Sequence, residues 1–266
     1  MNLIISVDKY IKQSFNDSDT PSTIIIVPYR NREIHKILFE EAMKNNLSQL
    51  KSYKIYYAHQ NDLRPFNRGA MKNLGFLAIK KLFPKHYRNI TFVFHDIDCW
   101  HTNPNAIDYK TEKGTVKHYY GYKFALGGIF AIKGCDFEKI CGFPNFWGWG
   151  MEDNVIYERC IKTGIIVDRS IFYDITDRNM SRPFDGFKRI YNKRDVVIYK
   201  HKMSGNINNL YNCEWTIDDN MINITSFLCE SNLENQLFTE FDIRQGNKLP
   251  VSKDIDMRQM KLIFYN

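Results

Sequence analysis

The first hundred residues alternate between short apolar runs and amphipathic stretches, and this alternation limits the folds open to the chain. The β-branched run over residues 23–27 is typical of a strand that is buried on both faces. Amphipathic helices are predicted over 34–45 and 70–82, and two further strands over 54–58 and 90–94. Strands that alternate with helices predict an α/β protein with a parallel sheet.

The pattern becomes irregular after residue 100. Strands are predicted over 128–132, 165–167 and 221–228, and helices over 136–141 and 153–163. The polar and aromatic range 101–123 and the charged range 172–194 are both predicted to be irregular. There is no internal repeat and no linker rich in Pro, Gly or Ser. The sequence therefore predicts a lead-in over residues 1–22 and one domain over 23–266.

The composition is that of a globular protein, with 44% hydrophobic and 25% charged residues among 266. The net charge of +7 comes from Lys and Arg residues that are spread along the chain. A protein that binds duplex nucleic acid usually gathers them in a stripe, so we expect no nucleic-acid partner. A basic pocket for a phosphorylated small molecule explains the excess equally well.

Cysteine spacing and hydropathy bear on cellular location. The six cysteines show neither a CxxC pair nor a regular framework, which argues against a metal cluster and favours a reducing compartment. Residues 1–10 contain a short apolar patch but no signal sequence. No run approaches the roughly 20 apolar residues of a membrane helix. These features predict a cytoplasmic or soluble intracellular protein without a membrane anchor. The richness in Lys, Ile and Asn favours a viral or microbial type.

Two arginines directly follow the first predicted strand. In open α/β sheets, ligands bind at the carboxyl ends of the strands. Arg30 and Arg32 lie at such an end. The planar guanidinium forms paired hydrogen bonds with phosphate, although the same residues also suit a solvated helix start.

An acidic motif, His95-Asp96-Ile97-Asp98, follows the third predicted strand. The period of two along a strand would place Asp96 and Asp98 on one side. Two such carboxylates repel each other unless a cation lies beside them, and Mg²⁺ or Mn²⁺ takes oxygen ligands and bridges to phosphates. The DxD motif therefore predicts a divalent cation. His95 resembles half of a hydrolase metal motif, but no second His-Asp pair supports a hydrolase.

Two further segments combine glycine, aromatic and charged residues. Phe66-Asn67-Arg68-Gly69 opens the second predicted helix, where an arginine at a helix N-terminus favours anions, although Asn67 also suits a simple N-cap. The stretch 142–153, GFPNFWGWGMED, joins two tryptophans to an acidic pair. Glycines allow close approach of a ligand, tryptophans supply flat walls, and the carboxylates supply a possible base. A buried aromatic loop followed by a helix explains the same residues.

Together these motifs resemble the β-1,4-galactosyltransferase family (glycosyltransferase family 7) and its N-acetylgalactosaminyl and xylose-linked relatives. The matching motifs are VPYRNR at 27–32, FNR at 66–68, FHDID at 94–98, GG at 127–128 and FWGWGMED at 146–153. The resemblance covers roughly residues 23–230. It implies a GT-A fold, a single Rossmann-like domain with a mixed central sheet, and an inverting, Mn²⁺-dependent transfer of a sugar from UDP to a glycan acceptor.

The resemblance also implies a role for each matching residue. Contacts with uridine diphosphate are implied for Pro28, Arg30, Arg32, Phe66 and Arg68, with Asp96 near the nucleotide. Asp98 would bind Mn²⁺, and Trp149 and Gly150 would line the donor on a loop that closes over it. Glu152 would hydrogen-bond the donor sugar. Asp153 would be the base that takes the proton of the acceptor hydroxyl.

The residue types suit this chemistry on their own. Inversion at an anomeric carbon needs one base on the acceptor side, which a positioned carboxylate supplies. It also needs charge stabilisation on the leaving diphosphate, which a divalent cation and arginines supply. A loop that closes would exclude water, which otherwise hydrolyses the donor.

Several positions depart from the family pattern. Met151 replaces a glycine and is expected to stiffen the loop, and Asn154 ends the acidic run. Met180 is the implied second metal ligand, but Pro183 stands where the family usually has a histidine ligand. Asp177, Asp185, His201 or water are the alternatives for that ligand. The Golgi members carry an N-terminal membrane anchor, which is not apparent here.

One departure concerns the donor sugar. Relatives that use galactose carry a Tyr two residues before the glycine pair, where this chain has Ala125. The smaller side chain leaves room for an N-acetyl group, so UDP-GalNAc or UDP-GlcNAc is expected to be tolerated or preferred over UDP-Gal. The competing hypothesis is a non-catalytic carbohydrate- or nucleotide-binding module. Such a module would have little reason to keep Asp98, Glu152 and Asp153 together.

Overall fold

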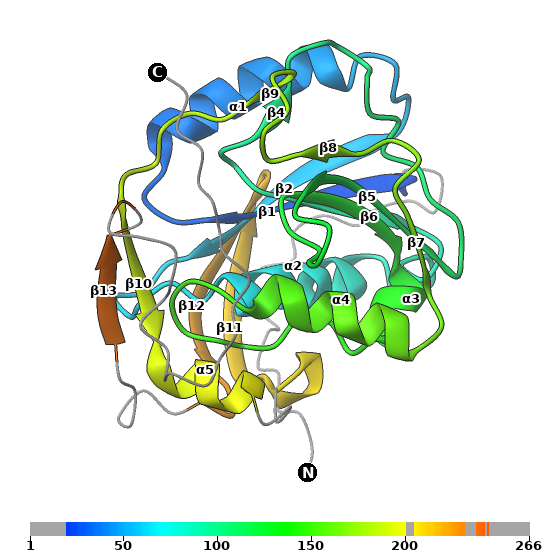
Figure 1. Ribbon diagram of the computed structural model, residues 1–266. Coiled ribbons are helices and arrows are strands. Elements are labelled where there is room, and N and C mark those ends of the chain that lie inside the picture. The colour runs from blue at the N-terminus through cyan, green and yellow to red at the C-terminus, as the bar shows by residue number, and fades with distance from the viewer. Residues whose placement is uncertain (1–19, 201–204, 232–237, 243, 245–266) are drawn as a thin grey trace.

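The computed structural model describes residues 20–200, 205–231, 238–242 and 244 (Figure 1). The strands of its large sheet are β1 (Thr23–Tyr29), β2 (Tyr53–Gln60), β3 (Thr91–His95), β5 (Thr115–Gly121), β6 (Ile129–Lys133), β7 (Ile166–Asp168), β8 (Tyr173–Asp174), β11 (Tyr211–Asp218) and β12 (Met221–Leu228). The strand order is β11-β12-β2-β1-β3-β6-β5-β7, with β8 paired to β5. Most of the predicted lead-in lies outside the described residues.

Two small sheets and five helices complete the described structure. The small sheets pair β4 (Trp100–His101) with β9 (Met180–Ser181), and β10 (Lys188–Asn192) with β13 (Phe238–Asp242). The helices are α1 (Glu33–Asn46), α2 (Arg68–Leu82), α3 (Gly134–Lys139), α4 (Glu152–Lys162) and α5 (Lys193–Lys200), with a 3₁₀ turn over Ile207–Asn209.

The large sheet is mixed, as the GT-A resemblance implies. The pairs β1–β2, β1–β3 and β2–β12 are parallel, whereas β3–β6, β5–β6 and β11–β12 are antiparallel. The parallel part corresponds to the predicted alternation of strands and helices. The expectation of an α/β fold with a mixed central sheet is confirmed.

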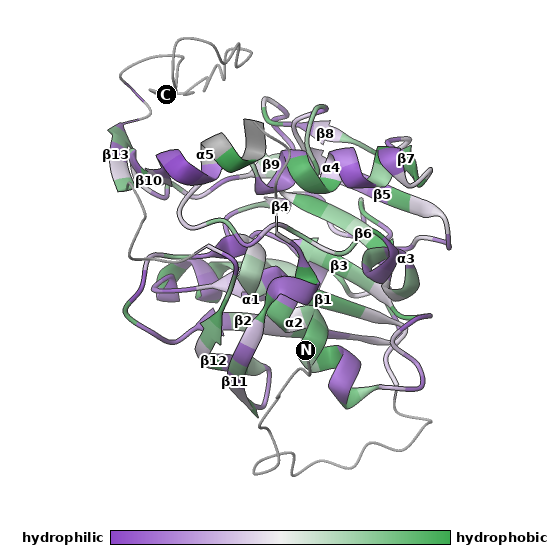
Figure 2. Ribbon diagram, turned by 90° about the horizontal axis from the view of Figure 1, so that it is seen from below, coloured by the Kyte–Doolittle hydropathy of each residue, from purple (hydrophilic) through white to green (hydrophobic). Residues whose placement is uncertain are grey.

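Helices cover both faces of this sheet, with α1 on one side and α2, α3 and α4 on the other (Figure 1). Alternate residues of β1 enter the two cores: Ile24 and Ile26 join the cluster on the α2 side, and Ile25 and Val27 join the cluster beneath α1. Burial on both faces explains the continuous apolar run. Strands β3 and β6 at the centre are likewise predominantly hydrophobic (Figure 2).

Two ranges predicted to be irregular contain strands. The range 101–123 includes β5, and 172–194 includes β8, β9, β10 and the start of α5. In β5 the polar His118 is fully buried. Its burial is tolerated because its Nε2 atom has a polar partner, the carbonyl oxygen of Gly127 at 3.1 Å. The sequence pattern does not show that such a partner exists, so β5 was wrongly predicted as loop. Strand β11 was also missed.

The arrangement of strands brings several loops to one edge. Strands β1, β2 and β3 are parallel and therefore end at the same edge of the sheet, where the antiparallel β6 begins. Helix α2 starts soon after β2. A crevice at this kind of edge is where open α/β sheets bind ligands.

Candidate active site

The segments at this edge carry most of the residues selected from the sequence. The loops after β1, β2 and β3 contribute Arg30 and Arg32, Phe66 and Arg68, and Asp96 and Asp98. The glycine pair 127–128 lies just before β6, and Glu152 and Asp153 open α4. Side-chain contacts join three of these five segments in one charged cluster.

Asp96 and Asp98 lie in a turn, not on a strand. Strand β3 ends at His95, so the argument from the strand period was wrong. The Asp96 amide donates to the carbonyl oxygen of Gly128 at 2.9 Å, which ties the turn to the glycine pair. Gly128 has a φ of +66°, and a Cβ there would lie 2.5 Å from the ring of Tyr120. This position therefore requires glycine.

Arg68 is the centre of the charged cluster. It is the first residue of α2, whose N-cap Asn67 accepts a hydrogen bond from the Ala70 amide at 2.9 Å. Arg68 donates to Asp96 Oδ1 from Nε at 3.2 Å and from Nη2 at 2.7 Å. Its Nη1 atom donates to both oxygens of Asp153, at 3.0 and 2.9 Å, and to Glu152. One guanidinium thus bridges the DxD motif and the acidic pair.

The pKa values of the acidic residues in the cluster shift in opposite directions. Burial alone would raise the pKa of Asp96, but Arg68 and Lys72 outweigh it and lower the pKa to about 2. Burial raises the pKa of Glu152, and the neighbouring charge of Asp153 acts in the same direction. The cluster therefore holds Asp96 ionised and makes ionisation of Glu152 more costly.

Asp153 is held by close backbone packing. Its carbonyl oxygen accepts a hydrogen bond from the Leu126 amide at 2.9 Å. A Cβ at Gly127 would lie 2.6 Å from Asp153 Oδ2, so the absence of a side chain there makes room for the carboxylate. The glycine pair thus positions both acidic motifs, Gly128 through Asp96 and Gly127 through Asp153.

Met151 occupies a position that favours glycine. It has a φ of +73°, in the left-handed region, and immediately precedes Glu152 at the start of α4. A side chain in that region costs about 1–2 kcal/mol. Met151 is buried with Phe146, Val155 and Tyr191, and this packing offsets the cost. Stiffening of the loop by Met151 stays a prediction.

Sequence reasoning missed Lys72. This lysine lies one helical turn after Arg68 and is fully buried. Its Nζ atom lies 3.4 Å from Asp96 Oδ1 and 3.6 Å from Asp153 Oδ1. The spacing of four from Arg68 placed both cations on one helix face, and this was the signal available in the sequence.

Asp98 is well placed to bind a cation. Removal from water raises its pKa to about 6, and the carboxylates of Asp96 and Asp185 act in the same direction. Asp98 forms no ion pair with the described residues. The neighbouring arginines pair with other carboxylates, Arg32 with Asp185 and Arg68 with Asp96. A divalent cation would neutralise this carboxylate, so the oxygen donors present fit Mn²⁺ or Mg²⁺.

The remaining metal ligands stay predictions. Over residues 20–200, 205–231, 238–242 and 244, no three His, Cys, Asp or Glu side chains form a group that could hold a metal ion. Met180 lies in β9 and is buried in the hydrophobic core on the α1 side of the sheet. This core also contains Ile97 and Cys99, the neighbours of Asp98 in sequence. A site built on Asp98 and Met180 is compatible with this placement.

The alternatives for the third ligand differ in their surroundings. Asp185 is 3.4 Å from Arg32 and 2.6 Å from Arg189. Asp177 accepts a hydrogen bond from the Asn179 amide at 2.9 Å, within a turn. Pro183 offers no side-chain ligand, and His201 lies outside the described residues. Asp185 is the alternative that the electrostatics place beside Asp98.

Three of the residues that the resemblance implies in nucleotide binding contact other parts of the protein. Arg30 Nη1 donates to the carbonyl oxygen of Arg64. Pro28 is buried in β1 beside Ala58 of β2. The carbonyl oxygen of Phe66 accepts a hydrogen bond from the Gly148 amide at 3.0 Å. Phe66 therefore connects the start of α2 to the Trp-Gly loop.

The two tryptophans of that loop have different environments. Trp147 is buried, stacks on Phe227 with ring centroids 5.5 Å apart, and donates from Nε1 to the carbonyl oxygen of Ser231 at 2.9 Å. The interpretation as a packed aromatic loop holds for this residue. Trp149 is only partly buried, and no atom of the described residues lies within 4 Å of a Cβ placed on Gly150. The second Trp-Gly pair is therefore less tightly packed against the described residues than Trp147.

Asp195 anchors the loop from α5. Its Oδ2 atom accepts hydrogen bonds from the Trp147 amide at 2.6 Å and from Asn192 Nδ2 at 2.7 Å. Its Oδ1 atom accepts one from Ser231 Oγ at 3.1 Å. Burial raises the pKa of Asp195 from 3.8 to about 6, and these hydrogen bonds offset the rise only in part.

Asp195 should make the folded state more stable in mild acid. Its pKa is higher in the folded than in the unfolded state, so the folded state binds the proton more tightly. The free energy of unfolding should therefore rise as the pH falls from about 7 to about 4. Asp195→Asn should remove this contribution and be more stable than wild type by about 2–3 kcal/mol near pH 7, with little difference near pH 4. Urea unfolding across this pH range measures both.

Asp174→Asn is a control of opposite sign. Hydrogen bonds from Thr176 lower the pKa of Asp174, so its contribution is lost as the pH falls. A pH profile for Asp195→Asn that runs parallel to the wild-type profile would show that Asp195 does not titrate in this range.

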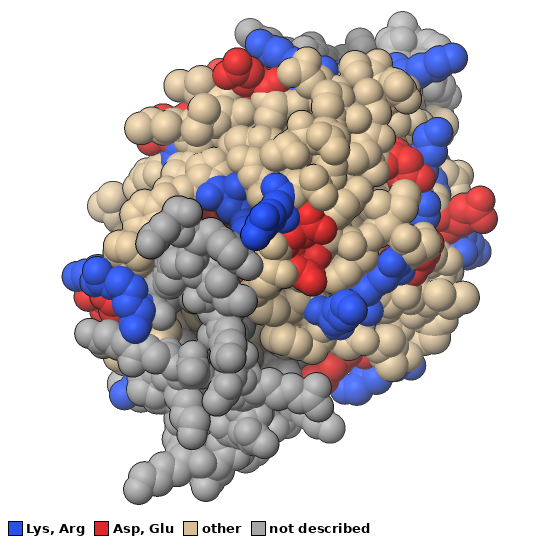
Figure 3. Space-filling view, turned by 45° about the horizontal axis from the view of Figure 1, so that its top comes forward, with Lys and Arg blue, Asp and Glu red and all other residues tan. Residues whose placement is uncertain are grey.

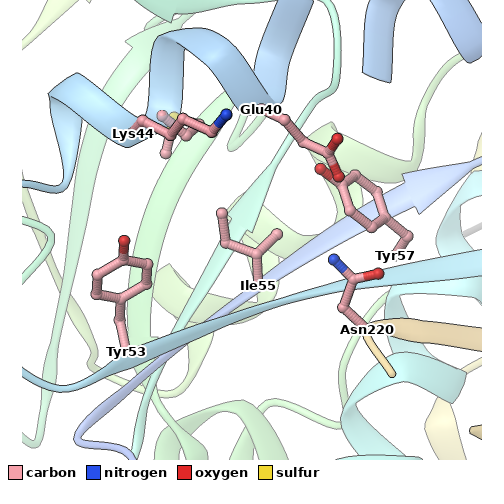
Figure 4. Close-up of a pocket in the computed structure, with 7 residues that line it drawn as sticks. Glu40, Lys44, Tyr53, Ile55, Tyr57 and Asn220 are labelled. Carbon is pink, nitrogen blue, oxygen red and sulfur yellow. The ribbon is translucent and has the colours of Figure 1, made fainter. Parts of the chain in front are cut away.

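A pocket of about 220 Å³ lies elsewhere, between α1, β2 and the turn that joins β11 to β12 (Figure 4). Glu40, Lys44, Tyr53, Tyr57 and Asn220 line it, with Met43 and Ile55. It contains none of the residues selected from the sequence. Charged side chains on the face shown in Figure 3 gather in small groups of both signs, unlike the wide basic surface that binds nucleic acid.

Comparison with known proteins identifies relatives of this chain. The model described as the N-terminal region of glycosyl transferase group 7 matches residues 15–110, and that described as the N-terminal domain of galactosyltransferase matches 110–182. Human beta-1,4-galactosyltransferase 4 is 35% identical over 144 residues, which are 49% of this chain and 40% of that protein. The Caenorhabditis elegans xylosylprotein 4-beta-galactosyltransferase is 29% identical over 187 residues, 66% of this chain and 62% of the relative.

Solved structures show the same fold. The catalytic domain of Drosophila beta-1,4-galactosyltransferase 7, in complex with xylobiose, superposes with a TM-score of 0.62 at 20% identity, over 81% of this chain and 97% of that one. A mutant of the same enzyme, in complex with manganese, UDP-Gal and xylobiose, gives 0.59 at 18% identity over the same shares. This likeness confirms the GT-A fold.

The predicted cytoplasmic location is wrong. The matched relatives are animal β-1,4-galactosyltransferases, a family of Golgi enzymes whose catalytic domains are lumenal. This chain spans about 40% of the length of the first curated relatives that it matches, so its hydropathy says nothing of an anchor. No described helix is both long enough and apolar enough to cross a bilayer.

The two family models and the relatives agree with the motifs at the sheet edge. The models together match residues 15–182, more than half of the chain. The chain therefore belongs to the β-1,4-galactosyltransferase family, glycosyltransferase family 7.

Proposed function

We propose that this protein is an inverting, divalent-cation-dependent glycosyltransferase that moves a hexose or N-acetylhexosamine from a UDP-sugar to a hydroxyl of a glycan acceptor. The observation that carries the proposal is the contact of Arg68 with Asp96 on one side and with Glu152 and Asp153 on the other. It joins the motif expected at the donor phosphates to the acidic pair expected at the donor sugar and the acceptor.

Asp153 acts as the general base in this mechanism. The acceptor hydroxyl gives its proton to the carboxylate as its oxygen forms a bond to the anomeric carbon of the donor. The bond from that carbon to the diphosphate breaks on the opposite face, and the electron pair leaves with UDP. Glu152, buried at the first position of α4, is proposed to hydrogen-bond the donor sugar. A positioned base of this kind contributes about 10²–10⁴-fold.

In the proposed reaction Arg68 changes partners. It contacts both oxygens of Asp153 and therefore competes with the acceptor hydroxyl for the carboxylate. The diphosphate of a donor is a competing anion, and arginine binds it with paired hydrogen bonds. Arg30 and Arg32, at the end of β1, are the other cations proposed for the diphosphate.

Asp98 is proposed to hold the cation, with Met180 as a second ligand. When bound, Mn²⁺ would act as a Lewis acid on the leaving diphosphate. The raised pKa of Asp98 and the adjacent carboxylates of Asp96 and Asp185 support a cation at this position. The Drosophila relative crystallised with manganese and UDP-Gal supports the same choice of metal and donor class.

The donor sugar and the acceptor are proposed from the residues near Asp153. Ala125 is buried two residues before Gly127, which abuts the Asp153 carboxylate. Its small side chain supports use of UDP-GalNAc or UDP-GlcNAc besides UDP-Gal. The ranges 109–123 and 172–194, proposed to bind the acceptor, meet where Tyr120 of β5 pairs with Tyr173 of β8.

A donor screen tests the function. We expect release of UDP from at least one of UDP-Gal, UDP-GalNAc and UDP-GlcNAc, stimulated by glycan acceptors and abolished when the metal is chelated. Asp98→Ala should raise the Mn²⁺ concentration needed for half-maximal UDP binding by at least about tenfold, since a charged ligand is lost. Calorimetric titration of UDP at several Mn²⁺ concentrations measures this shift.

Asp108→Ala is the matched control, because Asp108 is exposed and pairs with Lys117 away from the cluster. Strict use of UDP-Gal would reject the proposal on the donor sugar. UDP binding without turnover of any donor would favour the non-catalytic module instead.

A further inference from the structure

Lys72 is a buried cation that the proposed reaction does not yet use. It lies in α2, one turn after Arg68, with 1% of its side chain exposed. Its ammonium faces Asp96 Oδ1 at 3.4 Å and Asp153 Oδ1 at 3.6 Å. On its other side the Nζ atom lies 4.8 Å from the ring centroid of Phe143.

Packing alone does not explain a lysine at this position. An ammonium loses its hydration on burial, and this loss is recovered only when charges and hydrogen bonds replace the water. Lys72 Nζ has no hydrogen-bond partner among the described residues. The next residue, Asn73, is fully satisfied by comparison: its side chain donates to Phe143 O and accepts from the Phe143 amide, each at 2.9 Å.

The two cations of the cluster hold Asp153 in different ways. Arg68 contacts both carboxylate oxygens, whereas Lys72 approaches Oδ1 alone. Arg68 retains 16% exposure of its side chain and faces the sheet edge, whereas Lys72 is enclosed by the core. A donor diphosphate can therefore compete for Arg68 but not for Lys72.

We propose that Lys72 is a positioning residue for the transfer reaction, and this inference rests on the proposed function. Its ammonium holds Oδ1 of Asp153 and Oδ1 of Asp96 when Arg68 turns to the donor diphosphate. Asp153 then keeps its orientation and presents Oδ2, which Arg68 has left, to the acceptor hydroxyl. Lys72 also keeps a positive charge between two carboxylates that would otherwise repel each other.

Neutral substitutions test this role. In Lys72→Met, we expect kcat to fall by roughly 10²-fold, the effect of a misplaced reacting group. The KM for the UDP-sugar and the affinity for UDP should stay within about threefold of wild type, because Lys72 does not touch the donor. Lys72→Gln should show the same separation of kcat from KM. Thermal unfolding of both variants reports whether the fold persists.

Lys80→Met is the matched control on the same helix. Lys80 pairs with Glu138, is 38% exposed and does not contact the cluster, so the variant should keep the wild-type kcat and KM. A kcat within threefold of wild type in Lys72→Met and Lys72→Gln would overturn the inference. Equal losses of UDP affinity and kcat, or a failure of both variants to fold, would assign Lys72 to stability and overturn it as well. Inactivity of the wild type with every donor would instead reject the proposed function.

Discussion

Replacing Asp153 by asparagine is expected to abolish sugar transfer while leaving UDP binding nearly unchanged. Asparagine has the shape of aspartate and can still accept a hydrogen bond from Arg68, but it cannot take a proton from the acceptor. Loss of a general base costs about 10²–10⁴-fold in rate. Transfer at saturating donor and acceptor measures the loss, and calorimetric titration with UDP and Mn²⁺ measures the binding.

The same charge change on the same helix provides the control. Glu158 lies in α4 and its carboxylate is 41% exposed, so Glu158→Gln should transfer sugar at the wild-type rate. Turnover by Asp153→Asn within tenfold of wild type would reject Asp153 as the base. A matching loss of UDP affinity would show that the substitution disturbs the donor site and not the proton transfer alone.

The central part of the fold could be predicted because its pattern is local. Strand β1 is buried on both faces, so each of its residues between 23 and 27 is apolar or β-branched, and no partner has to be known. Strand β5 contains Lys117, which pairs with Asp108, and the buried His118, whose Nε2 atom lies 3.1 Å from the carbonyl oxygen of Gly127. The strand propensities of the residues do not reveal such partners.

The residues of the candidate site also differ in whether a local sequence pattern reveals them. Arg68, Asp96, Glu152 and Asp153 belong to compact motifs, and the structure brings them into direct contact. Lys72 has no motif of its own, and a lysine in an amphipathic helix is normally solvated. Its position becomes informative only when two carboxylates from distant segments are placed beside it.

Asp195 was also beyond sequence reasoning, for a different reason. It follows the charged range 172–194, and no motif of the sequence pointed to it. Its carboxylate in fact turns inward to the backbone of Trp147. Whether a charged residue points into the protein depends on buried donors, and the sequence does not display them.

Arg68→Met is expected to cause the largest loss of stability. Methionine fills most of the same volume but leaves Asp96, Glu152 and Asp153 without their shared counter-ion. Breaking a buried ion pair by removal of one partner costs about 3–5 kcal/mol, because an uncompensated charge remains in the protein. Urea unfolding near pH 7 measures this loss.

The loss of stability in Arg68→Met should become smaller as the pH falls. Arg68 and Lys72 hold the pKa of Asp96 near 2, below its value of 3.8 when unfolded. The stabilisation from Asp96 is therefore complete above about pH 4 and lost as the pH falls towards 2. The difference between wild type and Arg68→Met should shrink over that interval, since protonated Asp96 no longer needs the guanidinium.

Arg88→Met is the control, because it removes the same charge from an exposed position. Arg88 pairs with Glu138 and its side chain is 59% exposed, so Arg88→Met should lower the stability far less than Arg68→Met. If Arg68→Met were equally mild, the three carboxylates would not depend on Arg68 for their charge balance. Release of Arg68 to a donor diphosphate would then cost little, as expected if Lys72 alone balances Asp96 and Asp153. The stability of this one variant therefore bears directly on the proposed movement of Arg68 during catalysis.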